Sequence, residues 1–517
     1  MIDTSALREK VLDLAIRGKL VPQDPNDEPA SVLLGRIRAE KEQMVKDGKL
    51  KAKDIKNDTV IFKGEDNLHY EKFSDGTVKC IEDEIPFDVP DGWAWCRLNS
   101  AVDVRDGTHD TPKYVSSGVP LITSKNLNEG GIDYSNVKFI SEHDAKIINM
   151  RSGVDVGDIL YAMIGTIGNP ALIKENILIS IKNVALFKFD YSLDLYNEYI
   201  LLFLQYAQKD MKYNASGGLQ PFVSLSYLRN YLVPIPPINE QRKISDIYKN
   251  IEKNIDTIEN NKSATMDLIS SIKSKILDLA IRGKLVPQDP NDEPASVLLE
   301  RIKAEKEELI KQGKIKRDKK ESVIFKGEDN SYYADLPSGW CVSTLGNLTT
   351  SSCLNDGDWI LSDNMVKFGN IKLIQLGSVG FMRYIDKSFK YLTDETFEEL
   401  GCTEIHSGYL LINRIVSDKM SACILPKIEG KKITTVDTCW ISPCDDWYNL
   451  KYILYAISSP QFQSSVMLNS SGTTRKRISK LNLISLPLAI PPLAEQKRIV
   501  DAIETAFEHI DNILNNL

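Results

Sequence analysis

The chain has 517 residues, and 42% of them are hydrophobic, 26% charged and 8% aromatic. This composition is typical of globular proteins and excludes a wholly disordered or fibrous chain, and no stretch approaches the roughly 18 apolar residues of a membrane span. The formal net charge of −8 gives no overall signature of nucleic-acid binding, although a local basic surface is enough for that function.

The N-terminal segment carries the first copy of a long internal repeat. Residues 1–10 lack the apolar core of a signal peptide, so we expect a cytoplasmic protein. Residues 12–34 are identical to residues 277–299, which sets an offset of 277 − 12 = 265. A second matched pair, 235–241 and 490–496, has an offset of 490 − 235 = 255. A period of this size is too long for a solenoid and indicates two large half-molecules.

The first globular segment, residues 68–239, contains apolar runs typical of strands at 119–123, 159–164 and 177–181, and a helical pattern at 197–208. Glycine lets backbone amides approach phosphates, and glutamine can form two hydrogen bonds to adenine. Two polar stretches therefore supply candidate DNA contacts, namely Thr123, Ser124, Lys125, Asn126, Gly217, Gly218 and Gln220. Ordinary turn chemistry and a solvated loop remain the alternatives.

Apolar residues recur at steps of three and four from Ile244 to Leu279. This spacing predicts an uninterrupted helix over 240–281 with a coiled-coil seam, and we expect Gly283 and Pro287 to end it. The same steps recur at the C-terminus, from Ile499 to the last residue.

The two ends of the chain correspond to the two halves of this central helix. With the offsets above, Leu517 maps onto 517 − 255 = 262 and Met1 onto 1 + 265 = 266. We therefore predict a circular arrangement of two equivalent halves with pseudo-two-fold symmetry, cut inside one of two long helices. Both termini should then lie near the middle of the central helix, because the seam positions of the split helix need that partner. A duplication without closure is the alternative.

The second globular segment, residues 331–494, matches the first at scattered landmarks and has a helical pattern at 450–458. The fold class that we predict is α/β, with two α/β domains separated by long coiled-coil helices. The helical segments are nearly identical in their two copies, whereas the globular segments have diverged. This contrast indicates that the helical segments make the same partner contacts twice, whereas the two globular segments recognise two different things.

A loop near the end of the second globular segment concentrates positive charge, with four cations between positions 475 and 480. Such a loop can neutralise phosphates, and arginine can read guanine with two hydrogen bonds. The candidate DNA contacts here are Thr473, Thr474, Arg475, Lys476, Arg477 and Lys480, together with Gln375 and Ser378 at a polar strand end. A solvated loop is the alternative.

The sequence lacks motifs of catalysis and cofactor binding. It contains no GxxxxGK[ST], no GxGxxG, no HExxH and no Asn-Pro-Pro-aromatic motif, and its five histidines are scattered. The eight cysteines form no Cys-x-x-Cys pair, so free thiols are expected. We expect no catalytic, cofactor-binding or metal-binding residues, which disfavours a self-sufficient methyltransferase or nuclease.

Three motifs together resemble the specificity subunit of Type I restriction–modification systems. They are Gly-Trp before each globular segment (92–93 and 339–340), Ile-Pro-Pro-x-x-Glu-Gln before each long helix, and Leu-Asp-Leu-Ala-Ile-Arg-Gly-Lys-Leu-Val-Pro-Gln after it (12–23 and 277–288). Residues 106–112 and 118–124 also look like that family's first target-recognition domain, which adds Thr108 and His109 as candidate DNA contacts. In the second globular segment the run 411–414 adds Arg414.

The resemblance implies a DNA-binding subunit that is not itself an enzyme and that reads a bipartite double-stranded target. It implies two target-recognition domains (68–239 and 331–494), a split conserved helical region (1–67 and 495–517) and a central one (240–330). The helical regions would bind two methyltransferase subunits, which carry S-adenosylmethionine, and restriction subunits with ATP and Mg²⁺ would join. The central helix would be about 63 Å long at about 1.5 Å per residue, enough to span one turn of DNA. An adaptor that binds only proteins is the alternative.

Overall fold

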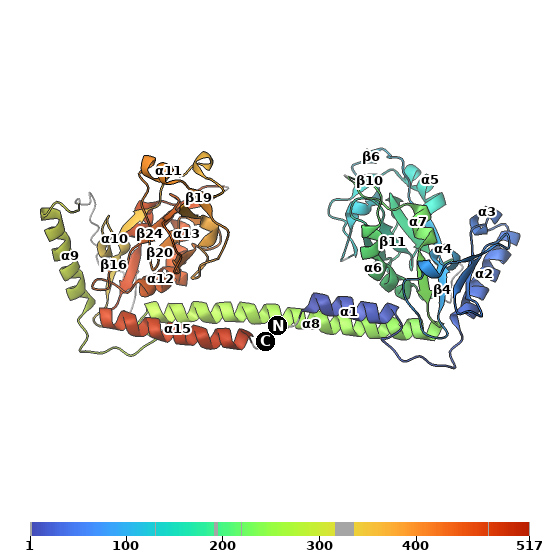
Figure 1. The fold of residues 1–517 in the computed structure, drawn as a ribbon, viewed down its shortest axis with the longest axis horizontal. Coiled ribbons are helices and arrows are strands. Elements are labelled where there is room, and N and C mark those ends of the chain that lie inside the picture. Colours follow the sequence, from blue (N-terminus) through green and yellow to red (C-terminus); the bar gives the residue numbers. More distant parts are fainter. Residues whose placement is uncertain are drawn as a thin grey trace. The chain divides into compact units, whose positions relative to one another are not determined.

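The computed structural model describes residues 3–515 except 130, 191–194, 219, 316–335 and 474. The chain divides into two compact units, with the boundary between residues 261 and 262. We call residues up to 261 the first unit and those from 262 the second unit (Figure 1). Each unit combines helices with small mixed sheets, so the chain is an α/β protein with two domains.

The first unit is built around two four-stranded sheets, ordered β12-β11-β14-β5 and β13-β7-β10-β6. Their strands are β5 (Asp103–Asp106), β6 (Tyr114–Val115), β7 (Val119–Thr123), β10 (Lys138–Ile140), β11 (Ile159–Ala162), β12 (Gly168–Leu172), β13 (Ser180–Lys182) and β14 (Val184–Lys188). The smaller sheets contain β1 (Val60–Lys63), β2 (His69–Lys72), β3 (Val78–Cys80), β4 (Ala94–Arg97), β8 (Leu127–Asn128), β9 (Gly131–Ile132) and β15 (Leu232–Ile235).

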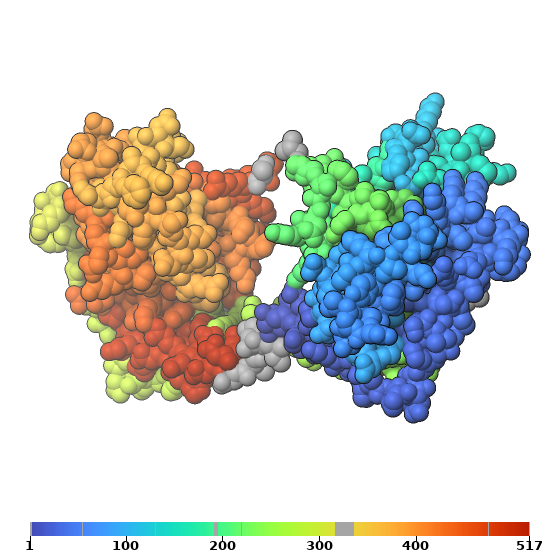
Figure 2. Space-filling model, turned by 45° about the vertical axis from the view of Figure 1, so that its right-hand side comes forward, coloured from blue at the N-terminus to red at the C-terminus, as the bar shows by residue number. Residues whose placement is uncertain are grey.

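Helices lie beside the sheets of the first unit, and Figure 1 labels β10 and α5 at the end of the unit away from α8. In Figure 2 the cyan-to-teal atoms of this segment lie at the upper right. The described helices of the first unit are α1 (Thr4–Ile16), α2 (Ala30–Lys46), α3 (Ala52–Ile55), α4 (Leu98–Ala101), α5 (Glu142–Ser152), α6 (Asn197–Tyr213) and α7 (Leu225–Asn230). The long α8 (Ile238–Ile281) begins in the first unit and continues into the second. Short 3-10 turns are η1 (Glu82–Glu84) and η2 (Ser124–Asn126). Helix α6 exceeds the predicted 197–208 by more than one turn, because Met211 is still buried in the core.

The second unit repeats this plan with shorter sheets, ordered β17-β24-β20-β22, β19-β18-β23, β21-β26-β25 and β16-β27. Its strands are β16 (Cys341–Thr344), β17 (Leu354–Asp356), β18 (Ile371–Ile374), β19 (Lys390–Leu392), β20 (Leu410–Asn413), β21 (Ile415–Val416), β22 (Ala422–Ile424), β23 (Lys432–Thr434), β24 (Thr438–Ile441), β25 (Ser470–Ser471), β26 (Lys476–Ile478) and β27 (Pro487–Ile490). Its described helices and turns are α9 (Ala295–Lys311), α10 (Leu345–Leu348), η3 (Ser362–Asn364), η4 (Leu376–Ser378), α11 (Asp394–Glu399), α12 (Leu450–Ser458), α13 (Pro460–Leu468), α14 (Lys480–Ser485) and α15 (Leu493–Asn515).

Most predicted elements are present, although several bounds differ. The strand predicted over 159–164, for example, is β11 and ends at Ala162. The helix predicted over 240–281 is observed as α8, and α12 has the predicted bounds. The strand predicted over 177–181 begins only at Ser180, because β13 first pairs with β7 at Ser180–Leu121 and the preceding Leu178 is exposed to solvent. The prediction was wrong there because an apolar run without a pairing neighbour does not form a strand.

Within each unit, a terminal helix packs along α8. In the first unit the Arg8 guanidinium contacts Glu252, Asp256 at 2.7 Å and Glu259 at 3.0 Å. In the second unit the Lys273 ammonium lies 2.6 Å from Asp511 of α15. The start of α1 therefore lies beside α8 near position 259, and the end of α15 lies beside α8 near position 273.

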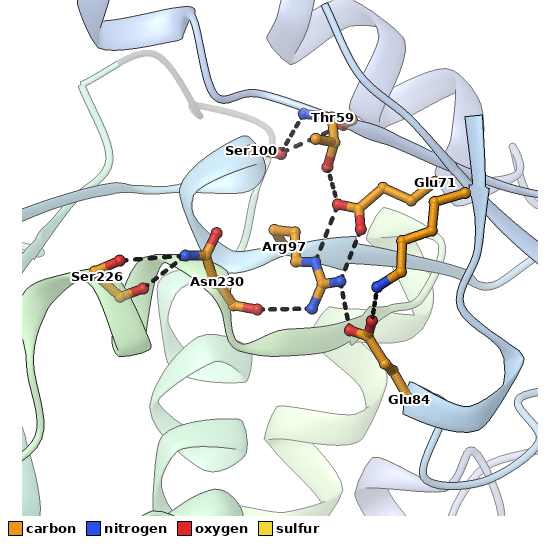
Figure 3. Close-up of polar contacts among 8 residues, drawn as sticks. Thr59, Glu71, Glu84, Arg97, Ser100, Ser226 and Asn230 are labelled. Atoms are coloured by element: carbon orange, nitrogen blue, oxygen red, sulfur yellow. Dashed lines mark hydrogen bonds and ion pairs between the residues drawn. The ribbon is translucent and has the colours of Figure 1, made fainter. Parts of the chain in front are cut away.

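A buried ion pair fastens the small sheet β1-β2-β3 to the first unit. Figure 3 shows Arg97, at the end of β4, between the two carboxylates that it binds. Its Nε and Nη2 donate to Glu71 at 3.1 and 2.7 Å, and Nη2 also donates to Glu84 at 2.7 Å. Nη1 donates to the Asn230 carbonyl oxygen at 2.9 Å, and the Thr59 hydroxyl donates to Glu71 at 2.6 Å. Glu71 is thus held on both oxygens.

Candidate nucleic-acid interface

Two parallel strands of the first unit end at the same edge. Strand β13 pairs in parallel with β7, and the last pair is Lys182 with Thr123. A short segment crosses beside this edge, because Thr108 donates its backbone N–H to the Ile181 carbonyl at 3.0 Å and accepts from the Asn183 N–H at 3.2 Å. Residues that follow strands at a sheet edge are free to face a ligand. We call 107–109, 123–126, 182–183, 216–218 and 220–222 the first rim.

His109 lies at the first rim with both of its ring nitrogens bound by neighbouring side chains. Its Nδ1 lies 3.0 Å from the Asn183 amide oxygen, and its Nε2 lies 2.8 Å from an oxygen of Asp106. The other oxygen of Asp106 accepts a hydrogen bond from Arg151. Hydrogen bonds from both ring nitrogens to these acceptors raise the pKa of His109 above its ordinary value. The protonated ring is therefore favoured more than in a free histidine, and most of the side chain faces solvent.

Ser124 links the first rim internally rather than facing solvent. Its buried hydroxyl donates to the Asn183 carbonyl at 3.0 Å and lies 3.4 Å from the Ile164 backbone N–H. Asn126 is buried as well, and its side-chain oxygen accepts hydrogen bonds from the Thr123 amide and hydroxyl at 3.0 and 2.8 Å. Lys125, between them, is exposed. Of this predicted tip, Lys125 is the side chain that can reach a ligand directly.

The predicted glycine loop closes against the same rim. Ser216 and Phe222 exchange backbone hydrogen bonds at 3.0 and 2.8 Å, and the Gly165 N–H donates to the Pro221 carbonyl at 2.8 Å. Gly217 has a φ of +96°, and a Cβ there would lie 2.6 Å from the Gln220 carbonyl oxygen, so the turn requires glycine. Gly217, Gly218 and Gln220 are exposed. The structure thus brings this loop together with the segments at 108 and 124.

The second unit repeats the backbone of this edge with other side chains. Asp358 donates its N–H to the Thr434 carbonyl and accepts from the Val436 N–H, both at 2.8 Å, as Thr108 does with Ile181 and Asn183. By these bonds Asp358 occupies the position of Thr108, and Trp359 that of His109. Gln375 follows β18 as Thr123 ends β7, and it is half-buried. We call 357–359, 375, 414–416, 435–437, 470–473 and 475–480 the second rim.

A hairpin carries the cationic loop onto the second rim. Strand β26 pairs with β25 and with β21, and its Ile478 N–H donates to the Arg414 carbonyl at 2.9 Å. Gly472 has a φ of +119°, and a Cβ there would lie 2.4 Å from the Arg475 carbonyl oxygen. The hairpin turn therefore requires glycine, as the loop at Gly217 does.

The four cations of the hairpin differ in what they contact. Arg477 pairs with Asp437 at 2.9 Å, and the Lys480 ammonium donates to the Asn355 side chain at 2.7 Å. Arg475 and Lys476 are exposed, and neither has an acidic partner among the described residues. The exposed Thr473 lies beside them, and Thr474 lies outside the described residues. Arg475 and Lys476 are the charges that this edge offers to a ligand.

Two candidate contacts of the second unit face the protein instead. Arg414 is only 5% exposed, its Nε lies 3.1 Å from Asp356 and its Nη2 donates to the Val436 carbonyl. Ser378 is buried in the turn η4, where its N–H donates to the Gln375 carbonyl at 2.9 Å. Both residues therefore stabilise the backbone of the second rim instead of facing solvent.

Sequence reasoning missed Lys182, Asn183 and Trp359. Lys182 and Asn183 follow an apolar run as Thr123 and Ser124 do, so the same strand-end signal could have found them. Trp359 gave no such signal, because tryptophan is far more often buried than exposed.

Within the part of the chain that the structure describes, no cluster of three or more His, Cys, Asp or Glu has the arrangement of a metal site. None of the described helices has the length and apolar composition of a membrane crossing.

The chain is similar throughout its length to one family of proteins. The family model for the Type I restriction modification DNA specificity domain matches residues 90–266 and again residues 337–517. The chain is 27% identical to the Type I restriction enzyme EcoEI specificity subunit of Escherichia coli, over 99% of this chain and 90% of that protein. It is 31% identical to the EcoAI specificity subunit of the same species, over 66% of this chain and 62% of that protein. A crystal structure of an HsdS subunit from Thermoanaerobacter tengcongensis covers 83% of this chain and 93% of that one, with 16% identity and a TM-score of 0.44.

Proposed function

We propose that this chain, which belongs to the Type I restriction–modification DNA specificity family, reads one half of a bipartite double-stranded DNA target with each of its two domains. It is a specificity subunit with two target-recognition domains, and the family match disfavours an adaptor that binds only proteins. The first half-site is read by the first rim and the second half-site by the second rim.

One observation carries this proposal. The two rims share the same crossing-segment hydrogen bonds, made by Thr108 in one unit and Asp358 in the other. On that common backbone, the first rim presents His109 and Gln220, whereas the second presents Trp359, Arg475 and Lys476. A shared backbone with different exposed side chains is what two domains need when they read two different half-sites, since base contacts specify and backbone geometry positions.

The long helices are proposed to space the two domains. The packing of α1 and α15 along α8 supports a coiled-coil spacer that closes the chain into a circle, with a pseudo-two-fold relation between its halves. The proposed domains are recognition domains at 68–239 and 331–494 and conserved helical regions at 1–67, 240–330 and 495–517. A helix of 44 residues is long enough to set a separation of at least one turn of DNA, about 34–36 Å.

Catalysis is assigned to partner subunits. We propose that the helical regions bind two methyltransferase subunits that carry S-adenosylmethionine, and that restriction subunits with ATP and Mg²⁺ complete the complex in the cytoplasm. The chain itself would hold no cofactor, in line with the missing sequence motifs. Purified alone, it should neither methylate nor cut DNA, and addition of its modification subunit should give methylation. Turnover by the isolated chain would contradict this division of labour.

The experiment that tests the proposed function is methylome sequencing. Cells that contain the modification subunit are sequenced with and without this chain, and the expected result is a bipartite methylated motif that depends on the chain. The motif then provides the target duplex for binding measurements. An unchanged methylome, together with equal affinity for target and random duplexes, would refute the proposal.

A further inference from the structure

Trp359 is displayed on the surface in a way that no other tryptophan of the chain is. Trp93, Trp95, Trp340, Trp440 and Trp447 are at most 8% exposed, whereas Trp359 is 68% exposed. Leu361 and Phe368, on the same loop, are also exposed. Burying the large apolar surface of an indole would stabilise the protein, and an exposed indole lacks that free energy. Such a ring therefore indicates a contact surface.

The backbone that carries Trp359 is fixed. The preceding Gly357 has no room for a Cβ, which would lie 2.4 Å from the Thr434 carbonyl oxygen. Asp358 is held by its two backbone bonds to Thr434 and Val436, and its side chain accepts from the Thr403 N–H at 2.9 Å. The indole therefore projects from an anchored backbone rather than from a loose loop.

Positive charge lies on the same edge as the indole. The segment that pairs with Asp358 continues to Asp437, which binds Arg477 of the cationic hairpin. On the Trp359 loop itself, the Lys367 ammonium lies 5.7 Å from the centre of the Phe368 ring. The exposed Arg475 and Lys476 lie on the same hairpin as Arg477. An exposed aromatic ring on an edge that also carries cations suits a nucleic acid, since cations neutralise phosphates while a ring stacks on a base or enters a base step.

We propose that Trp359 inserts its indole at a base step of the second half-site and opens the stack there. The inference rests on the proposed function and adds a way of reading sequence: the second domain would favour base steps that are easily unstacked, in addition to steps that it contacts by hydrogen bonds. The first domain has the His109 ring at the same position. The first domain would therefore read its half-site without inserting an indole into the base stack.

The test uses the full-length chain, target duplexes taken from the methylome, and Trp359→Ala. Since the other five tryptophans are buried, acrylamide quenching reports chiefly on Trp359. The target duplex should shield this signal. With 2-aminopurine placed along the second half-site, wild-type chain should raise its fluorescence and Trp359→Ala should not. The affinity of Trp359→Ala should fall about 5- to 150-fold, the range of one base stack.

Controls separate a wedge from a general surface effect. Met150→Ala removes an equally exposed apolar side chain from the first domain and should leave both signals unchanged. A duplex with a scrambled second half-site should abolish the difference between wild type and Trp359→Ala. Circular dichroism of the variant should match the wild type, because the indole contributes little to the core.

Three results would overturn the inference. Trp359→Ala with wild-type affinity and wild-type 2-aminopurine fluorescence would show that the indole does not enter the stack. Shielding of Trp359 by the modification subunit without DNA would make it a protein-docking residue. Failure of the wild-type chain itself to prefer the target duplex would remove the proposed function first, and that failure is visible before any variant is measured.

Discussion

The indole N–H of Trp93 donates to a carboxylate oxygen of Glu240 at 3.0 Å, and both residues are buried. The second unit has the same bond between Trp340 and Glu495, at 2.9 Å. In both units a glutamine side chain donates to the other carboxylate oxygen, Gln23 at 3.1 Å and Gln288 at 3.2 Å. In the first unit this junction joins the start of α8 to the residue before β4 and to the segment that follows α1. In the second unit it joins the start of α15 to the residue before β16 and to the segment that follows α8.

Glu240→Ala should lower the free energy of unfolding of the first unit by about 1–3 kcal/mol, because it leaves the buried Trp93 N–H without an acceptor. Glu240→Gln keeps one acceptor oxygen and should cost less. Urea denaturation of the full-length chain measures both, and Glu495→Ala is the matched variant in the second unit. Equal losses for Glu240→Ala and Glu240→Gln would show that the hydrogen bond to Trp93 is not what stabilises the junction.

The Arg97 cluster predicts a larger loss. Glu71→Ala removes the bidentate partner of a guanidinium that is only 13% exposed. It should reduce the unfolding free energy by about 3 kcal/mol, the lower end of the range for a broken buried pair, because Glu84 still binds Arg97. The exposed Glu65→Ala should change it little. Burial alone would raise the pKa of Glu71, but hydrogen bonds from Arg97 and Thr59 hold it below its ordinary value. Its contribution to stability is therefore present above the ordinary glutamate pKa and is lost as the pH falls through the lowered one. A wild-type stability for Glu71→Ala would contradict this account.

Sequence reasoning succeeded where the signal was local. The apolar steps from Ile244 to Leu279 contain the whole information for α8, since a helix needs only its own periodicity to be found. The rims depend on distant partners instead. Arg414 is buried because it meets Asp356 and Val436, and Ser124 is buried because it binds Asn183. The spacing of residues in the sequence does not predict such long-range pairs. Sequence reasoning could therefore not separate the site residues that are exposed from those that are buried in contacts within the protein.

His109 predicts a pH-dependent affinity for the first half-site. The pKa of His109 is raised by its hydrogen bonds to Asn183 and Asp106, so the imidazolium persists above the ordinary value of 6.5. Its charge is present below 6.5 and is lost as the pH rises through the raised pKa. Both ring nitrogens are already bonded within the protein, so the ring would attract the phosphates of the half-site through its charge alone. Affinity should fall by about fivefold over that range, because two opposite unit charges about 4 Å apart in water attract by about 1 kcal/mol.

Fluorescence anisotropy across pH would measure this fall, and His109→Gln should flatten it. His406→Gln changes another exposed histidine, in the second unit, and should leave the pH profile intact. A profile that stays the same in His109→Gln would mean that another group titrates.

The two rims should act independently. Replacing residues 68–239 with the corresponding domain of a relative should change one half of the methylated motif and leave the other half, because all described segments of the first rim lie within that range. Methylome sequencing of cells with the hybrid chain gives the result directly. A hybrid that altered both halves, or neither, would refute independent reading.

The exposed charges of the second rim make a quantitative prediction about salt. Arg475 and Lys476 are exposed, whereas Arg477 and Lys480 already contact Asp437 and Asn355. Each phosphate contact contributes about 0.9 to the slope of log affinity against log salt concentration. Replacing Arg475 and Lys476 with glutamine should therefore flatten that slope by about 1.8, and adding changes at Arg477 and Lys480 should flatten it less than twice as much.

The matched control is Lys427→Gln. Lys427 is exposed but precedes β23, so it lies at the opposite end of that strand from the second rim. This variant should keep the wild-type slope. If Arg475 instead reads a guanine, Arg475→Gln should lose about 1–3 kcal/mol of discrimination at one base position, while the slope changes by no more than one contact. A double variant with wild-type affinity, slope and base preference would mean that the hairpin is merely solvated, and would move the second half-site contacts to other residues of the rim.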